Sequence, residues 1–582
     1  MRIERHQVGQ ATVSGVRENF ANRIGGQIRS MSKAGPIATY EWQWIAEELL
    51  DYLGALSVER SDLDTPEAKA VLWDAAEAAA GAVAYAAYHP DASFHVMLDY
   101  VNFGMSYDPG GEKDPRGEVS PQEWIDAFCL AVLADRTTAH GEAFHFARET
   151  FGEAGAGSPA VELITGFMAQ VIGDVGDDDA EYPPSAEAKL AAIDAALARV
   201  RVRAEQTGES LLDRPDAEGL RTLRALAAGD REAFDTGLTD LLVPLGQPAQ
   251  GVGPRSLLPL LPITLAALAY RGSGWVPAVD TDYLPNALVT GFETLGPRVG
   301  GLGRDRRPDA VAALAAEPVL IDRPTPPHPL QPQGEAWLER NTREAFTEVN
   351  GEPPTVHQLA NALRYQELLF KARASHTTDV TDTQLANLRL ASQLGAALFR
   401  IALADPGTEA EVTIDGHTLR YPATRGKDAG PGQWQTATAF ALIAGARDDL
   451  APLVLAGPTH AQTDRSAFAS YRKALHTYLS GEDPLPATER ALHHVERARA
   501  RGFLPPPTVL FSQLVEGDKE SFNLALADAL EAHRDHYQVA DRADSCDAAT
   551  DLDILALACH ARRRGWHIQV ESPYLPRGPF LS

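Results

Sequence analysis

The 582 residues carry a formal charge of −28 at pH 7, from 80 acidic against 52 basic side chains. This balance argues against binding of nucleic-acid phosphates, which needs a surplus of Lys and Arg. An acidic surface can attract a basic protein partner, but the simplest interpretation is that the acidity only keeps the protein soluble. Hydrophobic residues make up 44% of the chain, which is typical of a packed globular protein.

Three cysteines, Cys129, Cys546 and Cys559, are too few and too scattered for a disulfide framework or a Cys-x-x-Cys metal site. The first ten residues, MRIERHQVGQ, lack the apolar core of a secretory signal. The best apolar run, 256–270, is too short to span a bilayer and contains two prolines. We therefore expect a cytoplasmic protein without a membrane segment.

The stretch LAAGDREAFDTGLTDLL at 226–242 returns as LVEGDKESFNLALADAL at 514–530. Each predicts two helices joined by a tight turn, with Phe234 or Phe522 on the apolar face of the second helix. In the first copy, Gly229 is expected to end one helix in the left-handed conformation and Asp230 to cap the next. Gly517 and Asp518 hold the same places in the second copy.

Other matching segments occur in the same order along both halves of the chain. Their counterparts share a Glu-Leu-Leu core, a glycine in a small-residue run, a tryptophan followed by two alanines, and a Gly-Trp start with a Tyr-Leu-Pro end. The pairs are 44–57 with 362–375, 76–88 with 391–403, 123–133 with 433–443, and 274–285 with 565–576. The last pair contains Trp275 and Tyr283 in one copy and Trp566 and Tyr574 in the other, for which we expect buried, structural roles.

These repeats predict an all-α protein built from two tandem copies of one helical-hairpin-rich module with small β-hairpin decorations. We expect the first module at 1–295, a Pro- and Gly-rich connection at 296–334 interrupted by a short helix, and the second module at 335–582. Asp415-Gly416 within 411–422 is a strong hairpin signal, and 94–103 stands in the corresponding place of the first module.

Catalytic signatures are missing from the sequence, and we expect no enzyme, no cofactor and no metal. His140 and His145 are five residues apart, whereas the HExxH zinc motif places its histidines four apart on one helix face. The glycine-rich GGLGRDRR at 300–307 fits neither phosphate-binding pattern. Cys559-His560 predicts a buried structural cysteine, with a Cys-His nucleophile as the alternative.

A polar stretch at 173–185 carries the cluster Asp177, Asp178, Asp179 and Glu181. The simplest interpretation is a solvated loop. Because exposed loops often carry recognition, the same cluster is also our candidate for a contact with a basic partner.

Three segments give the chain a resemblance to a known family. They are ANALRYQELLFKARAS, the proline-punctuated SLLPLLPITLAALAY followed by GW and YLP, and ALACHARRRGWHIQVESPYLP. They resemble the immunity 49 family of bacterial polymorphic toxin systems over most of the chain. The resemblance implies a cytoplasmic protein that neutralises a cognate toxin by binding it, and it supplies no active-site residues.

Two other classes stay open at this stage. A duplicated helical scaffold could serve as a regulatory adaptor for an endogenous partner. An enzyme with its site between the two modules is the other alternative, because domain interfaces are favoured positions for pockets. The sequence leaves the toxin's activity, the binding surface and the oligomeric state open.

Overall fold

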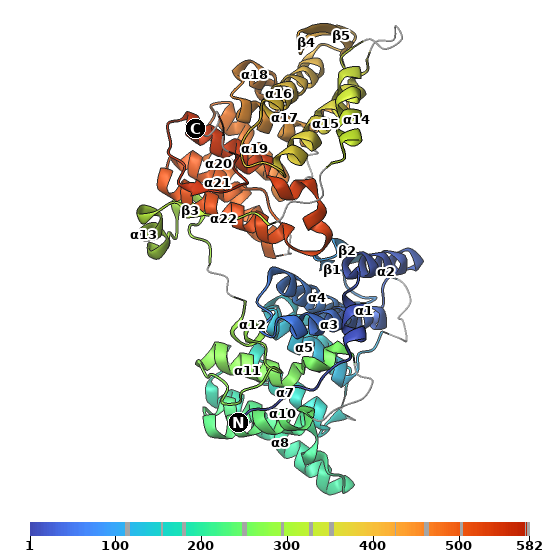
Figure 1. Cartoon of the computed structure of the whole chain (residues 1–582). Helices are drawn as coiled ribbons and strands as arrows, with labels where there is room; N and C mark the ends of the chain where they lie inside the picture. The colour runs from blue at the N-terminus through green and yellow to red at the C-terminus, as the bar shows by residue number, and fades with distance from the viewer. Residues whose placement is uncertain are drawn as a thin grey trace. The chain divides into compact units, whose positions relative to one another are not determined.

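A computed structural model describes the chain except for residues 111–116, 153–154, 177–181, 247–252, 293–295, 325–329, 348–353, 425, 459–464, 501–503, 577 and 579–582. It is 66% helix and 5% strand, which confirms the expected mainly helical class. The chain divides into two compact units, Met1–Thr294 and Leu295–Ser582 (Figure 1).

The first unit contains a long run of helices interrupted by one hairpin. Its elements are α1 (Gln10–Arg17), α2 (Phe20–Ala34), α3 (Thr39–Glu59), α4 (Pro66–Tyr88), β1 (Phe94–Leu98), β2 (Phe103–Tyr107), α5 (Pro121–Leu133), α6 (Thr137–Glu149), α7 (Pro159–Phe167), η2 (Met168–Ile172), α8 (Ala186–Thr207), η3 (Leu211–Asp213), α9 (Pro215–Ala227), α10 (Arg231–Leu242), η4 (Val243–Gly246), η5 (Pro254–Leu257), α11 (Leu260–Ser273) and α12 (Asn286–Thr290).

The second unit follows the same plan. Its elements are η6 (Gly301–Gly303), α13 (Pro308–Ala316), β3 (Val319–Leu320), α14 (Pro332–Glu344), α15 (Val356–Ala374), α16 (Asp382–Leu403), β4 (Glu409–Ile414), β5 (His417–Pro422), η7 (Lys427–Ala429), α17 (Pro431–Ala444), α18 (Arg447–Ala456), α19 (Ala467–Leu479), α20 (Leu485–Ala500), α21 (Thr508–Glu516), α22 (Lys519–Tyr537), η8 (Ala540–Asp544), η9 (Cys546–Ala549), α23 (Leu552–Arg563) and β6 (Val570–Glu571).

Packing partners repeat along with the order of the elements. In the first unit α4 packs against α3, α5, α6 and β1, and in the second α16 packs against α15, α17, α18 and β4. The pair α5 and α11 corresponds to α17 and α23, and the chain α7–α8–α9–α10 corresponds to α19–α20–α21–α22. The expected repetition of one helical topology is confirmed at the level of neighbours.

The repeated helix–turn–helix motif adopts the predicted geometry in both units. Gly229 and Gly517 end their helices with φ of 71° and 83°, a region that side chains with a Cβ rarely occupy. The carboxylates of Asp230 and Asp518 accept hydrogen bonds from backbone N–H groups of the first turn of α10 and α22. These caps satisfy donors that a helix start leaves unpaired.

Two fully buried tryptophans join neighbouring helices in the same way. Trp124 of α5 donates from Nε1 to the carbonyl of Phe144 in α6 at 3.0 Å, and Trp434 of α17 donates to the carbonyl of Leu453 in α18 at 2.8 Å. Both indoles are inaccessible to solvent, so each N–H needs this partner.

An arginine closes the end of each of these tryptophan helices. Arg271 of α11 donates to the carbonyls of Val132 and Leu133 at the end of α5, with the first contact at 2.9 Å. Arg563 of α23 donates to the last carbonyls of α17 in the same manner. The guanidinium satisfies carbonyls that a helix end leaves free and complements the negative end of the helix dipole.

The aromatic residues predicted to be structural lie at matching positions, and the two tryptophans differ in how far they are buried. Trp275 meets Phe234 edge-to-face at 5.7 Å between ring centroids, and Trp566 meets Phe522 edge-to-face at 5.5 Å. Tyr283, Tyr574, Phe234, Phe522 and Trp566 are buried, as predicted. Trp275 is of intermediate burial, so most of its surface is covered, as expected, but it is more exposed than Trp566.

The physical reason lies in the residues that precede the two tryptophans. The guanidinium of Arg564 lies 5.0 Å from the centroid of the Trp566 ring and covers it. The first unit has Gly272 and Ser273 between Arg271 and Gly274, where the second has only Arg564. Neither residue can cover the Trp275 ring as an arginine does.

The segment 296–334 also differs from the expected extended connection. Its described residues pack within the second unit, where Arg298 pairs with Asp528 at 2.8 Å and with Glu531 at 2.6 Å. The glycine-rich turn η6 packs against α21, and the short helix expected here is α13. The proline and glycine content thus coincides with short elements and irregular backbone that pack against the rest of the second unit.

A parallel pairing explains why this segment belongs to the second unit. β3 pairs with β6, so that Val319 lies opposite Val570. In the first unit, Arg2 makes a parallel bridge to Asp280, in the segment that follows Trp275. Each unit thus places a stretch from its beginning beside the stretch that follows its last long helix.

The two hairpins are the β decorations that the sequence predicts. β4 and β5 pair antiparallel around Asp415 and Gly416, both with positive φ, as a two-residue turn requires. β1 and β2 form the corresponding hairpin of the first unit. Among the described helices, none is long and apolar enough to cross a membrane.

Candidate functional site

The residues singled out for chemistry in the sequence do not converge. The acidic cluster Asp177, Asp178, Asp179 and Glu181 lies outside the described residues, so its role stays a prediction. Within the described part of the chain, no group of three or more His, Cys, Asp or Glu side chains is placed to hold a metal ion.

His140 and His145 face different carboxylates. His140 Nε2 lies 3.0 Å from Glu77 Oε1, and His145 Nδ1 lies 2.6 Å from Asp174 Oδ2. Burial favours the neutral form of Glu77, but its interactions with His140 and with the guanidinium of Arg136 outweigh this effect and lower the pKa of the carboxyl. Both histidines therefore belong to separate local hydrogen-bond networks.

Cys559 and His560 point to different surroundings. Burial raises the pKa of the fully buried Cys559 thiol to about 12, so the thiolate needed for nucleophilic attack is disfavoured. His560 Nε2 lies 3.0 Å from the hydroxyl of Tyr478. The geometry favours the structural interpretation of this cysteine.

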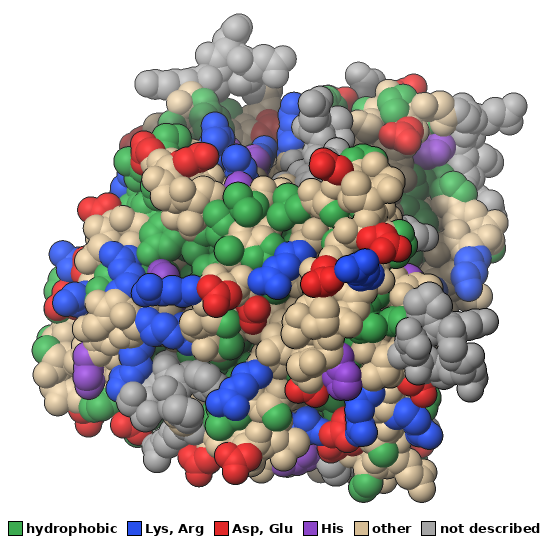
Figure 2. All heavy atoms as spheres, turned by 90° about the horizontal axis from the view of Figure 1, so that it is seen from above, with side chains coloured by type: hydrophobic (Ala, Val, Ile, Leu, Met, Phe, Trp, Pro, Cys, Tyr) green, Lys and Arg blue, Asp and Glu red, His purple; other side chains and the backbone are tan. Residues whose placement is uncertain are grey.

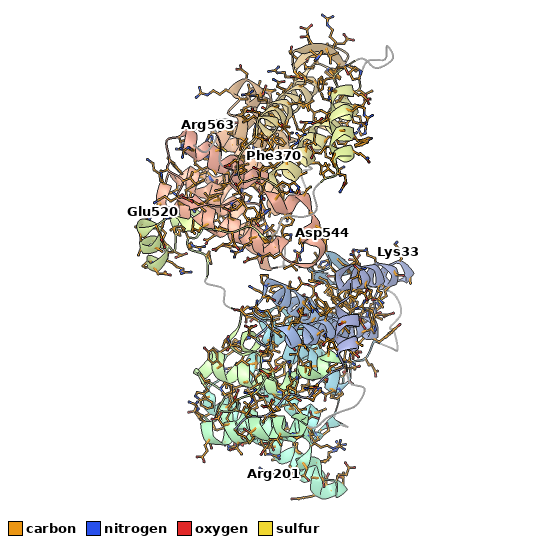
Figure 3. All side chains as sticks on the ribbon, viewed as in Figure 1. Lys33, Arg201, Phe370, Glu520, Asp544 and Arg563 are labelled. Carbon is orange, nitrogen blue, oxygen red and sulfur yellow. The ribbon has the colours of Figure 1, made fainter. Side chains whose placement is uncertain are left out.

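The described residues of the second unit instead form a polar pocket of about 240 Å³ that the sequence did not reveal. We call it the α15–α23 pocket. Two residues labelled in Figure 3 help to locate the pocket. Phe370 of α15 directly precedes the pocket residue Lys371, and Asp544 ends η8, just before η9. The pocket is lined by Glu367, Lys371, Gly432, Gln435, Thr436, Ala439, Phe468, Arg472, His533, Tyr537, Asp547, Thr550, Asp551, Leu552 and Asp553.

A lysine from α15 holds one wall of the pocket. Lys371 Nζ lies 2.5 Å from Glu367 Oε1, one helical turn earlier, and 2.7 Å from Asp547 Oδ1 in η9. Burial opposes the charged form of Lys371, but these two carboxylates overcome it and raise its pKa. Lys371 is thus a charged group whose two acidic partners already neutralise it.

A chain of side chains forms the opposite wall. Arg472 Nε of α19 donates to Gln435 Oε1 of α17 at 2.6 Å, and Gln435 Nε2 donates to the carboxyl of Asp553. Burial, followed by repulsion from Asp551, raises the pKa of Asp553 to about 7. An aspartate with a pKa near 7 marks a candidate functional position, because the pKa of most aspartates is about 4.

His533 of α22 lines the pocket without a polar partner. Its side chain is 3% exposed, and within the described structure neither ring nitrogen makes a hydrogen bond of ordinary geometry. Burial lowers its pKa, an effect that nearby Asp551 and the backbone of Ala548 only partly oppose. The ring is therefore neutral near pH 7, with one donor and one acceptor unused.

The first unit has different residues at the corresponding places. Aligning the Glu-Leu-Leu cores sets Tyr52 opposite Lys371, and Tyr52 stacks on Phe20 with ring centroids 4.0 Å apart. Aligning the capping arginines sets Leu261 opposite Asp553. Aligning the buried tryptophans sets Ile125 opposite Gln435 and Asp126 opposite Thr436. The carboxyl of Glu367 has a counterpart in Glu48.

The pocket could not be predicted from the sequence, because each of its residues belongs to a common local pattern. Glu367 and Lys371 form an ordinary i,i+4 pair, and Asp551 and Asp553 look like a routine cap and first turn of a helix. Nothing local indicates that η9, α15, α17, α19, α22 and α23 bring these groups to one place.

Comparison with known proteins assigns the chain to a family. The family model described as Immunity protein 49 matches residues 62–288 and 377–578, one segment in each unit and more than half of the chain together. No curated protein and no solved structure matches the chain. The repeated helical units and the match in each of them together place this chain in the Immunity protein 49 family.

Proposed function

We propose that this protein confers immunity by binding a cognate toxin directly, in a stoichiometric complex in the cytoplasm. The observation that carries the proposal is the match of the immunity-protein model in each of the two units. Membership of an immunity family implies a non-enzymatic role, and we extend this to a protein that blocks its target by occupancy alone.

The charge of the chain supports a basic toxin as the partner. A net charge of −28 creates a negative potential, which attracts a cationic partner from a distance and raises the association rate. Basic and acidic side chains are interspersed on the face drawn in Figure 2, so attraction by the net charge must be combined with local complementarity. An immunity protein gains from fast capture because a toxin acts while it is free.

The test is to purify the full chain together with the toxin encoded beside its gene. We expect a complex of defined stoichiometry by size-exclusion chromatography with light scattering, and rescue of growth when both are expressed in one cell. Association measured by stopped flow should slow markedly as the salt concentration rises, because screening shortens the reach of the negative potential.

Two outcomes would contradict this proposal. Protection by substoichiometric protein, with the toxin chemically altered and no lasting complex, would show catalysis instead of occupancy. Failure of the pure proteins to associate, combined with capture of a defined endogenous partner, would favour the adaptor function.

A further inference from the structure

The α15–α23 pocket is too small for most ligands and too polar for an apolar anchor. Its volume of about 240 Å³ falls below the range of roughly 300–1,000 Å³ of pockets that enclose drug-sized ligands. Such a space suits one extended side chain that enters from a partner surface.

The charges that line the pocket specify the sign of this side chain. Four carboxylates face two cations, and Lys371 is already held between Glu367 and Asp547. Asp551 and Asp553 make no ion pair with any described residue, and the charge of Asp551 raises the cost of ionising Asp553. An additional cation would relieve this repulsion.

His533 provides independent evidence that the pocket is incomplete. Leaving a buried polar group without a partner is costly, so most such groups in folded proteins are paired. The unused nitrogens of His533 lie in the wall of a pocket that also contains Asp551 and Asp553. Asp551 accepts a hydrogen bond from the backbone of Ile554 and Asp553 accepts one from Gln435, but neither forms an ion pair with a described residue. A ligand that donates hydrogen bonds in several directions would satisfy all three residues.

We propose that the α15–α23 pocket receives an arginine side chain of the toxin, with its guanidinium bound by Asp551, Asp553 and His533. A guanidinium presents five N–H donors in a planar fork, which suits two carboxylates and a neutral imidazole better than the compact ammonium of lysine. Phe468 lines the pocket and is 41% exposed. Arg472 lies over its ring, 5.8 Å from the centroid, and the exposed part of the ring offers apolar surface for the arginine stem. The proposal rests on the proposed function, because it names one contact of the same complex.

Such an arginine would be an energetic anchor of the interface. Arginine is enriched among the residues that dominate binding energies, and these residues insert into preformed pockets from which water is excluded. Because both pocket walls are already held by internal hydrogen bonds, little reorganisation accompanies binding.

Binding of the cation also predicts a pH dependence. The guanidinium favours ionised Asp553, so its affinity should rise as pH increases through about 7, where this carboxyl ionises. His533 stays neutral over this range because burial lowers its pKa. Among the described residues, the other charged or titratable groups near Asp553 are Glu367 and Lys371 of α15, Tyr471 and Arg472 of α19, Tyr537 of α22, Asp547 of η9 and Asp551 at the start of α23.

The first experiment uses the full chain without the toxin. N-acetyl-arginine amide is titrated into the protein while the imidazole signal of His533, identified by its loss in His533→Asn, is followed by NMR. N-acetyl-citrulline amide, which is nearly isosteric and uncharged, is the control probe. We expect saturable shifts with the arginine probe only, stronger at pH 8 than at pH 6, and lost in Asp553→Asn.

The second experiment uses the toxin. Asp551→Asn with Asp553→Asn should weaken toxin binding at least tenfold, mainly through faster dissociation, whereas Asp126→Asn should leave it within about twofold. Asp126 is the matched control because burial also raises its pKa, to about 6, in the first unit. Circular dichroism and thermal denaturation confirm folding, and the variant with only Asp553→Asn provides a second test if the double variant unfolds.

The outcomes separate this inference from the proposed function. A wild-type chain that binds no toxin defeats the function, whatever the arginine probe does. A wild-type chain that binds the toxin, with equal affinity in the pocket variants, defeats the arginine contact alone. Equal responses to the two probes, or equal losses in the pocket variants and Asp126→Asn, would also overturn it.

Discussion

The two units share the residues that join their helices and differ in the residues that line the α15–α23 pocket. Trp124 and Trp434 make the same hydrogen bond to the following helix, and Arg271 and Arg563 close the same helix end. At the places of Lys371, Gln435 and Asp553, the first unit has Tyr52, Ile125 and Leu261. The comparison teaches that one helical scaffold can keep the contacts that join its helices while the polar side chains at one place change.

Removing the ring of Trp275 or of Trp566 should give the largest difference in stability between corresponding variants of the two units. Trp566→Ala should cost about 3–5 kcal/mol, the usual range for removing a large buried aromatic ring. Trp275→Ala should cost clearly less, because solvent already reaches part of that ring. Urea denaturation followed by circular dichroism measures the loss of unfolding free energy in each variant. Equal losses would show that the cover by Arg564 does not make Trp566 contribute more than Trp275.

The stability of the second unit should depend on pH through Asp553, and that of the first unit should depend on pH more weakly. Its pKa is about 7 in the folded chain and about 3.9 in the unfolded chain, so the folded state binds more protons between these values. The folded state is therefore favoured below pH 4 and loses stability as pH rises toward 7. At about 1.4 kcal/mol per pKa unit, the loss amounts to about 2–4 kcal/mol.

Asp553→Asn tests this pH dependence directly. Since asparagine resembles the protonated acid, the variant should lack the loss and be more stable than the wild type above pH 7. Asp126→Asn should remove a smaller loss of stability, which in the wild type is complete near pH 6, where Asp126 ionises. Thermal denaturation from pH 4 to 8 measures the slopes, and an unchanged slope in Asp553→Asn would assign the dependence to another group.

The corresponding glycines Gly81 and Gly395 each allow a close contact, but their neighbours differ in how easily they can move. A methyl group added at Gly395 would lie 2.5 Å from the Cβ of Ala437 and 3.1 Å from its Cα, so α16 and α17 would have to separate. We expect Gly395→Ala to cost about 1–3 kcal/mol. Gly81→Ala should cost less, because its nearest atoms are Val96 methyl groups at 3.0 and 3.1 Å, which can move.

Gly26→Ala is the control for these glycine substitutions. This glycine lies inside α2 with no atom near the added methyl group, so the change should stabilise the chain by about 0.5–1 kcal/mol. Thermal denaturation of the three variants ranks them. A loss in Gly81→Ala as large as that in Gly395→Ala would mean that Val96 is as fixed as the backbone of α17.

The smallest expected difference concerns the two repeated caps. Asp230→Ala and Asp518→Ala should each cost about 1 kcal/mol, because each leaves helix N–H groups unpaired. Asp518 should lose slightly more, since its carboxylate accepts from two backbone N–H groups and also lies 3.5 Å from Arg306. Asn at either position keeps the cap and should restore most of the stability, as chemical denaturation would show.

Local sequence chemistry predicted most of the fold. Helix periodicity, the Gly-Asp turns and the Asp415-Gly416 signal depend on neighbours within a few residues, and the structure confirms the elements they predict. The repetition was also visible, because paired motifs keep their order along the chain. These features are encoded in short segments, so no knowledge of distant packing is needed to find them.

Tertiary structure alone decided the remaining features. Segment 296–334 joins the second unit because β3 finds β6, some 250 residues later in the chain, and local proline and glycine content says nothing of that pairing. Trp275 and Trp566 differ because a single arginine covers one ring. The α15–α23 pocket exists because separate helices bring ordinary surface-type residues together, and burial among them, which no single segment determines, changes the ionisation of Asp553 and leaves His533 without a partner.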